Sequence, residues 1–318
     1  MNNPAPTLNG FLLINKARGM TSMDVVRRVK RLVNMRKRVG HGGTLDPLAE
    51  GILPVCLGQA TRLMEILIND TKEYRMTVRL GIATDTYDAD GIPTEVKDAS
   101  AITRDQVEKA LDAFRGVFMQ MPPMHSALKK EGRRLYEFAR EGIEVERQPR
   151  EVEVTRLTIV EFNPPDLVIE AECGRGLYMR SLAHDLGQAL GCGGHVSVLL
   201  RLRTGPFHVR HAMTLDDLTQ ASSQRPWNEI LRPIDSMLLN MPAAVVDKPA
   251  ERHLRNGQGI ALGADALYAS HLESRRLYTA DGKFLALVRF DRPTGKWEPF
   301  KVFSLEESSP FAPQSHPV

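Results

Sequence analysis

The sequence predicts an α+β fold with a mixed, mainly antiparallel central sheet, followed by a small β-rich C-terminal domain. Segments typical of strands and helices follow one another without the regular βαβ repeat of a doubly wound sheet. The 318 residues are enough for about two domains. Hydrophobic residues make up 42% and charged residues 25% of the chain, which is close to the globular average. This composition excludes a wholly disordered, collagen-like or multi-span membrane protein.

The first expected elements are a strand and a helix, after a flexible N-terminus of residues 1–9. The apolar run FLLI predicts the strand, and a Gly turn follows it. Thr21 and Asp24 have the spacing of a capping box, so a helix is expected to begin between them. Its apolar residues recur on one face and its Lys and Arg residues on the other. We therefore expect an amphipathic helix with a basic outer face.

The segment GHGGTLDPLAEG (residues 40–51) is expected to be a loop, because four Gly and one Pro in twelve residues break any regular element. It contains Asp46, an acid followed by a proline. On spacing alone, a simple turn in which Asp46 caps Leu48 is favoured over a functional carboxylate.

The middle of the chain predicts two helices and three strands. Apolar residues alternate with polar ones from Lys72 to Leu80, which is typical of a half-buried strand and places Tyr74 on its apolar side. A cap signal at Thr103 predicts the start of a helix. Two strands, separated by prolines, are expected at residues 151–162 and 166–174, and a helix from Tyr178 to Leu190 is ended by Gly191.

Residues 120–150 differ from their surroundings, because they are dense in charge and bracketed by prolines. We interpret them as a projecting basic insertion in a domain of residues 10–240. The pattern is interrupted near residues 240–250, and short strands such as DGKFLALVRF follow. A second domain is expected at residues 241–305, with a disordered tail at 306–318.

The charge is unevenly distributed along the chain although the net charge is only +3. Residues 1–50 carry nine Lys or Arg against three acids, and residues 173–210 are also basic. This pattern fits one basic face directed at phosphates, and it fits solvated helix faces equally well. The three cysteines, Cys56, Cys173 and Cys192, show no paired spacing, and no signal peptide or anchor is evident. A reducing compartment, the cytoplasm, is expected.

Three other kinds of site are set aside. Cys192 and His195 lack a second close pair of zinc ligands. The acidic segment of Asp85, Asp88 and Asp90 does not match a calcium loop once Gly91 is placed at the invariant glycine, because the first and last ligand positions then hold Thr and Lys. Ser181 lacks the glycines of a nucleophile elbow, so a hydrolase triad with its neighbours His184 and Asp185 is not expected.

Several segments taken together resemble one family closely. They are GHGGTLDPLAEGILPVCLGQATRL, KEYR, GIATDTYDADG, PPMHSALKKEGRRLYEFAREG, CGRGLYMRSLAHDLG and GCGGHVSVLLRLRTGPF. In this order they resemble the TruB family of bacterial tRNA pseudouridine-55 synthases over roughly residues 10–240. The resemblance implies a sheet of the pseudouridine synthase type, and residues 241–305 resemble, more weakly, the PUA-type RNA-binding domain of that family.

The resemblance implies a role for each matching residue. Asp46 matches the catalytic aspartate, His41 a histidine that shapes the RNA-contacting loop, and Tyr74 the aromatic residue that stacks on the target base. Tyr178 and Arg180 match further pocket positions, and in the family the arginine pairs with the catalytic carboxylate.

Leu199 matches an apolar wall of the same pocket, although a simple core role fits it nearly as well. For Tyr74, core packing is the alternative to stacking. Where many members of the family have an aromatic residue before SA-L-K, this chain has His125.

The implied function is an isomerase that converts uridine 55 in the T loop of tRNA to pseudouridine. This reaction involves no net redox change, so no cofactor or metal is expected. An aspartate, ionised at neutral pH, serves it either as a nucleophile, on the sugar or the uracil ring, or as a base on a ribose proton. The expected partner is the T arm of tRNA, the expected state is a monomer, and no membrane is involved. The alternative is an RNA-binding or tRNA-folding factor in which catalysis is secondary, but such a protein has no need of a carboxylate among phosphates.

Overall fold

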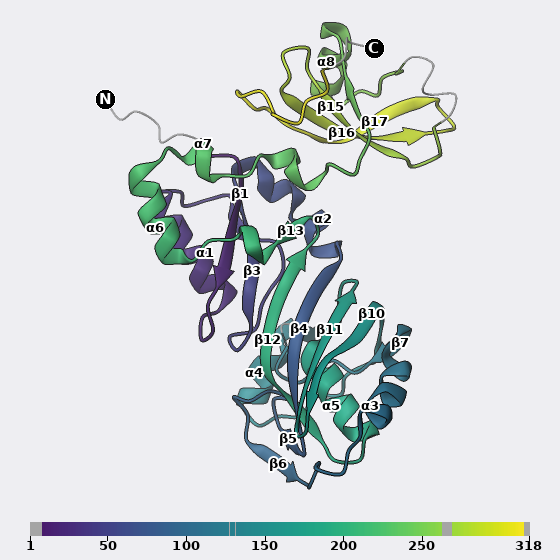
Figure 1. The fold of residues 1–318 in the computed structure, drawn as a ribbon. Helices are drawn as coiled ribbons and strands as arrows, with labels where there is room; N and C mark the ends of the chain where they lie inside the picture. Colours follow the sequence, from purple (N-terminus) through teal and green to yellow (C-terminus); the bar gives the residue numbers. More distant parts are fainter. Residues whose placement is uncertain (1–7, 127, 131, 263–268, 315–318) are drawn as a thin grey trace.

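Two sheets form the framework of the protein (Figure 1). The computed structural model describes residues 8–126, 128–130, 132–262 and 269–314. In spatial order, the large sheet consists of β1 (Gly10–Lys16), β3 (Glu50–Leu57), β12 (Gly194–Thr204), β4 (Lys72–Leu80), β11 (Asp166–Cys173), β10 (Arg150–Asn163) and β7 (Gly116–Gln120), with β2 (Val39–His41) on β3 and β13 (Phe207–His208) on β12. Only β3 and β12 run parallel among these pairs. The expected mixed, mainly antiparallel α+β sheet is confirmed.

Eight α-helices are found in the described residues. They are α1 (Ser22–Leu32), α2 (Met64–Asn69), α3 (Arg104–Leu111), α4 (Leu135–Arg140), α5 (Met179–Ala189), α6 (Leu215–Gln224), α7 (Trp227–Ile230) and α8 (Lys248–Arg255). Short 3-10 turns are η1 (Gly58–Leu63), η2 (Asp112–Phe114), η3 (Val209–His211) and η4 (Ile234–Met237). Helices α5 and α3 pack on the part of the sheet around β12, β4 and β10, whereas α1 and α6 lie together beside β1 (Figure 1).

The helix and strand signals of the sequence are confirmed at the residues that carry them. Thr21 accepts from the Asp24 N–H and Asp24 accepts from the Thr21 N–H, which is the expected capping box of α1. Thr103 forms the same motif with Gln106 at the start of α3. In β4 the side chains of Tyr74 and its alternate neighbours are buried on one face. Local polar and apolar patterns are sufficient for these elements because their partners lie within a few residues.

Strand β1 is apolar on both faces because it separates two cores. Leu12 and Ile14 belong to the main core under α1 and α5. Phe11 and Leu13 face a second cluster, which also contains Phe284 of the C-terminal sheet. This explains why the sequence shows a continuous apolar run there instead of an alternating one.

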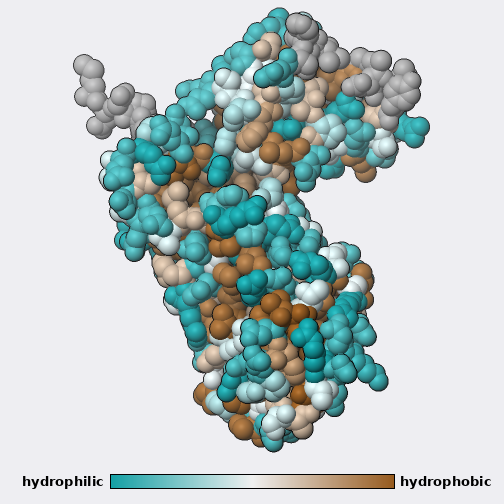
Figure 2. Space-filling view, viewed as in Figure 1, coloured by the Kyte–Doolittle hydropathy of each residue, from teal (hydrophilic) through white to brown (hydrophobic). Residues whose placement is uncertain are grey.

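The small sheet consists of β14 (Ala243–Val245), β15 (Ser274–Tyr278), β16 (Phe284–Asp291) and β17 (Lys296–Val302). The small β-rich C-terminal domain is thus present, at one end of the large sheet (Figure 1). Asp235, buried in the connection to it, accepts hydrogen bonds from the hydroxyls of Tyr278 at 2.6 Å and Ser309 at 2.5 Å. The surface in Figure 2 is hydrophilic over α6 and shows apolar residues along the middle of the large-sheet domain.

The two chain ends differ from the expected flexible segments where they are described. Residues 1–7 and 315–318 lie outside the described residues, but Asn9 accepts from the Gln59 N–H at 2.8 Å. The sequence predicts that residues 306–314 belong to a disordered tail, and this is wrong. They lie against the C-terminal domain because Ser309 bonds to Asp235 and its N–H donates to Gly282 O at 2.8 Å.

The insertion at residues 120–150 projects less than expected. Its first part packs on α5, where Ser181 Oγ donates to Met121 O at 2.8 Å and Arg180 donates to His125 O at 2.7 Å. It continues as a two-stranded sheet of β8 (Lys129–Lys130) and β9 (Arg133–Arg134), and then α4, whose Leu135 is buried. A similar small sheet pairs β5 (Ile82–Thr84) with β6 (Pro93–Val96). The apolar and hydrogen-bonded start of the insertion is what ties it to the domain.

Candidate active site

The loop that carries Asp46 (residues 42–49) joins β2 to β3. The Gly42 N–H donates to Pro54 O at 2.8 Å, which fixes the start of the loop to the sheet. The Ala49 N–H donates to Asp46 O at 3.1 Å. The turn therefore uses the backbone carbonyl of Asp46, and among the described residues its carboxylate forms no hydrogen bond to the loop. The side chain is thus available for chemistry instead of serving as a cap.

Two buried cations, Arg201 and Lys16, donate hydrogen bonds to backbone carbonyl oxygens of this loop. Arg201 donates from Nη2 to Gly43 O at 3.1 Å and from Nη1 to Thr44 O at 3.3 Å. Lys16 donates from Nζ toward Pro47 O at 3.4 Å. Burial lowers the pKa of Lys16 to about 8, and the opposing effect of the nearby Asp46 carboxylate is smaller. The shorter bonds of Lys16 Nζ go to Ala17 O at 2.9 Å and Met20 O at 2.8 Å, so its contact with the loop is the weaker one. Because hydrogen bonds from a charged donor are stronger than neutral ones, Arg201 contributes most to the conformation of the loop.

A buried hydroxyl supplies a further tie. Ser22, the first residue of α1, accepts from the Leu45 N–H at 2.8 Å and donates to Leu45 O at 3.1 Å. Both polar groups of one loop residue are satisfied by one side chain. The loop is therefore connected to β1, β12 and α1 at once, and Asp46 sits on a rigid support.

The carboxylate of Asp46 faces a single buried guanidinium. Arg180 Nε lies 2.9 Å from Asp46 Oδ2, as an ion pair without hydrogen-bond alignment. The Arg180 side chain is 5% exposed and that of Asp46 35%. The same guanidinium lies 3.4 Å from Asp88 Oδ2 and donates to Thr86 O at 3.2 Å and His125 O at 2.7 Å. Arg180 is held on several sides, so it orients Asp46 while one edge of the carboxylate stays open.

Two tyrosines lie close to this pair. Tyr74 pairs with Arg201 across β4 and β12, and burial raises the pKa of its hydroxyl against the opposing effect of that cation. Tyr178 precedes α5, and its backbone exchanges two hydrogen bonds with the Gln120 side chain, at 2.8 and 3.1 Å. Burial also raises the pKa of the Tyr178 hydroxyl, against the smaller opposing effect of the nearby Ser126 side chain. Both tyrosine hydroxyls therefore stay protonated at neutral pH.

His41 and Leu199 complete the set of residues that the sequence singles out. His41 ends β2 and is half-buried, and burial together with the charge of Arg201 lowers its pKa, so its ring is neutral at pH 7. Leu199 pairs with Met76 across β12 and β4 and lies in the main core with Leu45. The structure thus brings Asp46, Arg180, Tyr74 and Tyr178 together, places His41 near the loop, and gives Leu199 a position in the core.

Three further residues of the site are not singled out by the sequence. Asp88, which the sequence suggests only as a rejected calcium ligand, is a buried carboxylate that bonds through Oδ1 to the Thr86 hydroxyl at 2.6 Å and faces Arg180. In the sequence, Lys16 and Arg201 are noticed only as part of the basic charge of residues 1–50 and 173–210. Their one signal is position: each is a cation on the apolar face of a strand, where burial demands polar partners.

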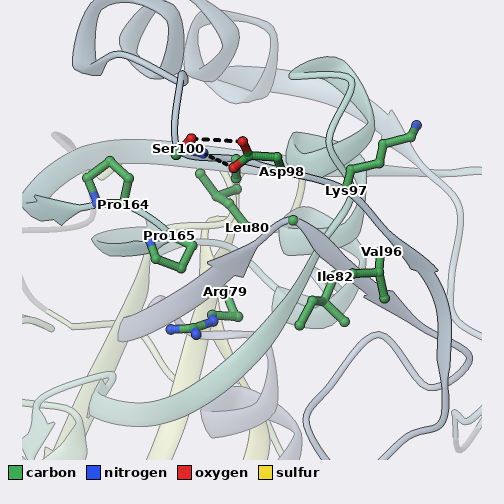
Figure 3. A pocket seen from close by; sticks show the side chains of 11 residues that line it. Arg79, Leu80, Ile82, Val96, Lys97, Asp98, Ser100, Pro164 and Pro165 are labelled. Carbon is green, nitrogen blue, oxygen red and sulfur yellow. Dashed lines mark hydrogen bonds between the residues drawn. The ribbon is translucent and has the colours of Figure 1, made fainter.

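A shallow pocket elsewhere on the molecule has no connection with this site (Figure 3). It has a volume of about 230 Å³ and is lined by residues at the far end of β4, on β6 and near the prolines before β11. Its polar groups already have partners: Arg79 bonds to Asp166 at 2.8 Å and Ser100 to Asp98 at 2.9 Å. Arg79 is five residues from Tyr74, about 17 Å along the strand.

Two further observations concern the described residues as a whole. No group of three or more His, Cys, Asp or Glu side chains is placed there so that it could hold a metal ion. None of the helices in the described ranges is long and apolar enough to cross a membrane.

The sequence matches known proteins over most of its length. Residues 30–179 match the N-terminal domain of the TruB family pseudouridylate synthases, and residues 180–239 match the C-terminal domain of tRNA pseudouridylate synthase B. A tRNA pseudouridine synthase B of Dehalococcoides mccartyi is 42% identical over 93% of this chain and 97% of its own. The protein of the same name from Chromohalobacter salexigens is 43% identical over 88% of this chain and 90% of its own.

A solved structure has the same architecture. A chain of the crystal structure of a Cbf5-Nop10-Gar1 complex superposes with a TM-score of 0.69 at 25% identity, covering 93% of this chain and 84% of its own. The fold and the family match together define a pseudouridine synthase, an isomerase. Within that class, the chain belongs to the TruB family.

Proposed function

We propose that the protein converts uridine 55 in the T loop of tRNA to pseudouridine, with Asp46 as its essential carboxylate. The observation that carries the proposal is the pairing of the partly exposed Asp46 with the buried Arg180 on a loop held by charged hydrogen bonds. Relatives that are 40% or more identical over most of the chain are named tRNA pseudouridine synthase B, which supports tRNA as the substrate.

The reaction needs a carboxylate and no redox group. The bond from ribose C1′ to uracil N1 breaks, the base turns, and C5 bonds to C1′; N1 gains a proton and C5 loses one. Asp46 assists the departure of the base, as a nucleophile or as a base. Arg180 holds the carboxylate in one orientation throughout, because its other contacts to Asp88, Thr86 and His125 fix the guanidinium.

Asp88 remains as a negative counter-charge to Arg180 when Asp46 loses its own negative charge. If Asp46 forms a bond or takes a proton, it loses its negative charge. A buried guanidinium without a counter-charge is costly, and Asp88 remains as that counter-charge. The three groups therefore form a unit in which one cation serves two carboxylates.

The pocket residues would receive a uridine drawn out of the folded T loop. Tyr74 presents an aromatic face that replaces lost base stacking, and Tyr178 supplies a second ring with a polar hydroxyl. His41 shapes the loop that contacts the RNA. Leu199, which belongs to the main core, would supply an apolar wall of the pocket.

The domain assignment belongs to the same proposal. Residues 10–240 form the catalytic domain and residues 241–305 a PUA-type RNA-binding domain. The protein acts as a monomer on the T arm of tRNA, in the cytoplasm. Its three cysteines are buried free thiols, which supports a reducing compartment.

The experiment is to incubate the purified protein with unmodified tRNA and to map pseudouridine by mass spectrometry. Product is expected at position 55 of the tRNA and at no other position. A tRNA that carries cytidine at position 55 is the control and should remain unmodified. Product at another uridine, or none in the natural sequence, would refute the assignment.

A further inference from the structure

A stretch of 21 residues, between Asp24 and Asp46, contains no acidic residue. It contains seven cations. Two are paired in the structure, Arg27 with Asp24 and Arg28 with Asp216. The other five, which we name the basic turn, have no carboxylate within ion-pair distance in the described part of the chain: Lys30, Arg31, Arg36, Lys37 and Arg38. Four of them, all but the half-buried Lys30, are exposed.

Stabilisation of α1 accounts for only part of this charge. Lys30 and Arg31 lie in its last turn, where cations interact favourably with the helix dipole. Arg36, Lys37 and Arg38 follow the helix, beyond the reach of that effect. Their charge therefore needs another explanation.

The backbone of the basic turn is fixed although its side chains are free. Asn34 and Arg38 have φ angles of 51° and 55°, in the left-handed region. Asn tolerates that region well, but Arg does not. The Arg38 carbonyl accepts from the Gly58 N–H at 2.8 Å, which ties the turn to the end of β3. An arginine at a position suited to glycine, with its backbone anchored and its side chain in solvent, indicates a use for the side chain.

The basic turn lies between the catalytic loop and the C-terminal domain. Strand β3 begins at Glu50, beside the Asp46 loop, and ends at Leu57, beside Arg38. At about 3.3 Å per residue, its two ends are about 23 Å apart. The next residues reach the C-terminal domain, since Gln59 accepts from the Ser304 N–H at 2.9 Å. A polyanion that enters at Asp46 and continues toward the C-terminal domain passes the turn.

We propose that the basic turn binds backbone phosphates of the RNA stem that adjoins the loop carrying the target uridine. This inference rests on the proposed function, which supplies the RNA substrate. Closely spaced cations without carboxylate partners gain from phosphate contacts by releasing counterions, independently of base sequence. The turn would thus bind and orient the stem while the Asp46 site acts on the loop.

The test is the salt dependence of tRNA binding by Arg36→Ala/Lys37→Ala, measured by fluorescence anisotropy between about 50 and 200 mM salt. Each phosphate contact contributes roughly 0.7 to 0.9 to the slope of log K against log salt, so the slope should fall by about 1.5 and the affinity about ten-fold. The matched control, Arg104→Ala/Lys109→Ala, removes two exposed cations from α3 and should leave both unchanged. At saturating tRNA, kcat of the turn variant should equal that of the unmodified protein.

A single substitution, Arg38→Gly, distinguishes an effect on stability from an effect on RNA binding. Arg38→Gly relieves the left-handed backbone, so its melting temperature should stay the same or rise while tRNA affinity falls about three-fold. An unchanged salt slope in the double variant, or an equal change in the α3 control, would overturn the inference. Lack of pseudouridine formation by the unmodified protein would instead refute the proposed function, and the binding slopes would still report on the turn.

Discussion

Arg180 is buried beneath Asp46, with its Nε 2.9 Å from the Oδ2 of that carboxylate. The two residues are far apart in the sequence and come from a helix and a loop. The arginine is enclosed by α5, the β5–β6 loop and the start of the insertion, through Asp88, Thr86 and His125. A buried cation that is fixed in this way keeps a partly exposed carboxylate in one orientation.

Replacing Asp88 by Asn should lower kcat about ten-fold, which corresponds to about 1.4 kcal/mol of transition-state stabilisation. Asn keeps the shape and the contact with Thr86 but removes the second counter-charge of Arg180. The affinity for tRNA should change little. Asp90→Asn is the control, because Asp90 lies on the same loop but forms an exposed ion pair with Arg18. Equal kcat values for the two variants would contradict the charge-balancing role of Asp88.

Arg201→Met should destabilise the protein by about 3 kcal/mol and reduce turnover, because Met fills a similar volume but leaves three carbonyl oxygens without their charged donor. These oxygens belong to Gly43, Thr44 and Ile52. Arg203→Met, two residues along β12, removes a partly exposed cation that pairs with Glu73 and Glu172, and should cost about 1 kcal/mol or less. Urea denaturation of both variants measures this difference. A smaller loss for Arg201→Met would show that the loop does not depend on the buried cation.

The buried Lys16 should make stability depend on pH above neutrality. Its folded pKa is about 8, below the value near 10.5 of a free lysine, so the unfolded chain binds more protons between these values. The stability of the unmodified protein should therefore rise by about 2 kcal/mol relative to Lys16→Met between about pH 7.5 and pH 9.5. Burial lowers the pKa of Lys72 to about 8 as well, so Lys72→Met should show the same trend. Differences that do not vary with pH would show that neither lysine changes its proton affinity on folding.

Tyr74→Leu should reduce kcat/KM ten- to hundred-fold, since stacking on a base is worth about 1–3 kcal/mol. The melting temperature should change little, because Leu keeps an apolar side chain at this buried position. Tyr74→Phe keeps the aromatic face and should bind tRNA normally, with a loss of turnover only if the hydroxyl transfers a proton. A Leu variant with near-normal turnover, or one that loses activity through unfolding, would return Tyr74 to a simple role in core packing.

The sequence is sufficient where the interactions are local. The capping box of α1 joins residues three apart, and the alternation in β4 identifies the buried face that contains Tyr74. The placement of Asp46 beside Arg180 is predictable only through the family resemblance. No local pattern relates two residues on such distant elements.

The supports of the site are not predictable from the sequence, because their partners are backbone atoms. Lys16 and Arg201 donate to carbonyl oxygens of the loop, and a carbonyl carries no side-chain signature in the sequence. Asp88 is one acid among several in its turn, and only the fold places Arg180 against it. The docking of residues 306–314 on the C-terminal domain is not predictable for a similar reason: the polar composition of this segment gives no sign of the buried Asp235 that binds Ser309.

The most direct test of the assignment is pseudouridine formation by Asp46→Asn. The amide keeps the shape of the side chain but cannot act as a nucleophile or as a base at neutral pH. The variant should bind tRNA at least as tightly as the unmodified protein, because it lacks a negative charge near the RNA backbone. Mass-spectrometric mapping should detect pseudouridine at position 55 with the unmodified protein and none with the variant, even after prolonged incubation. Substantial pseudouridine formation by Asp46→Asn would contradict the central role of this carboxylate.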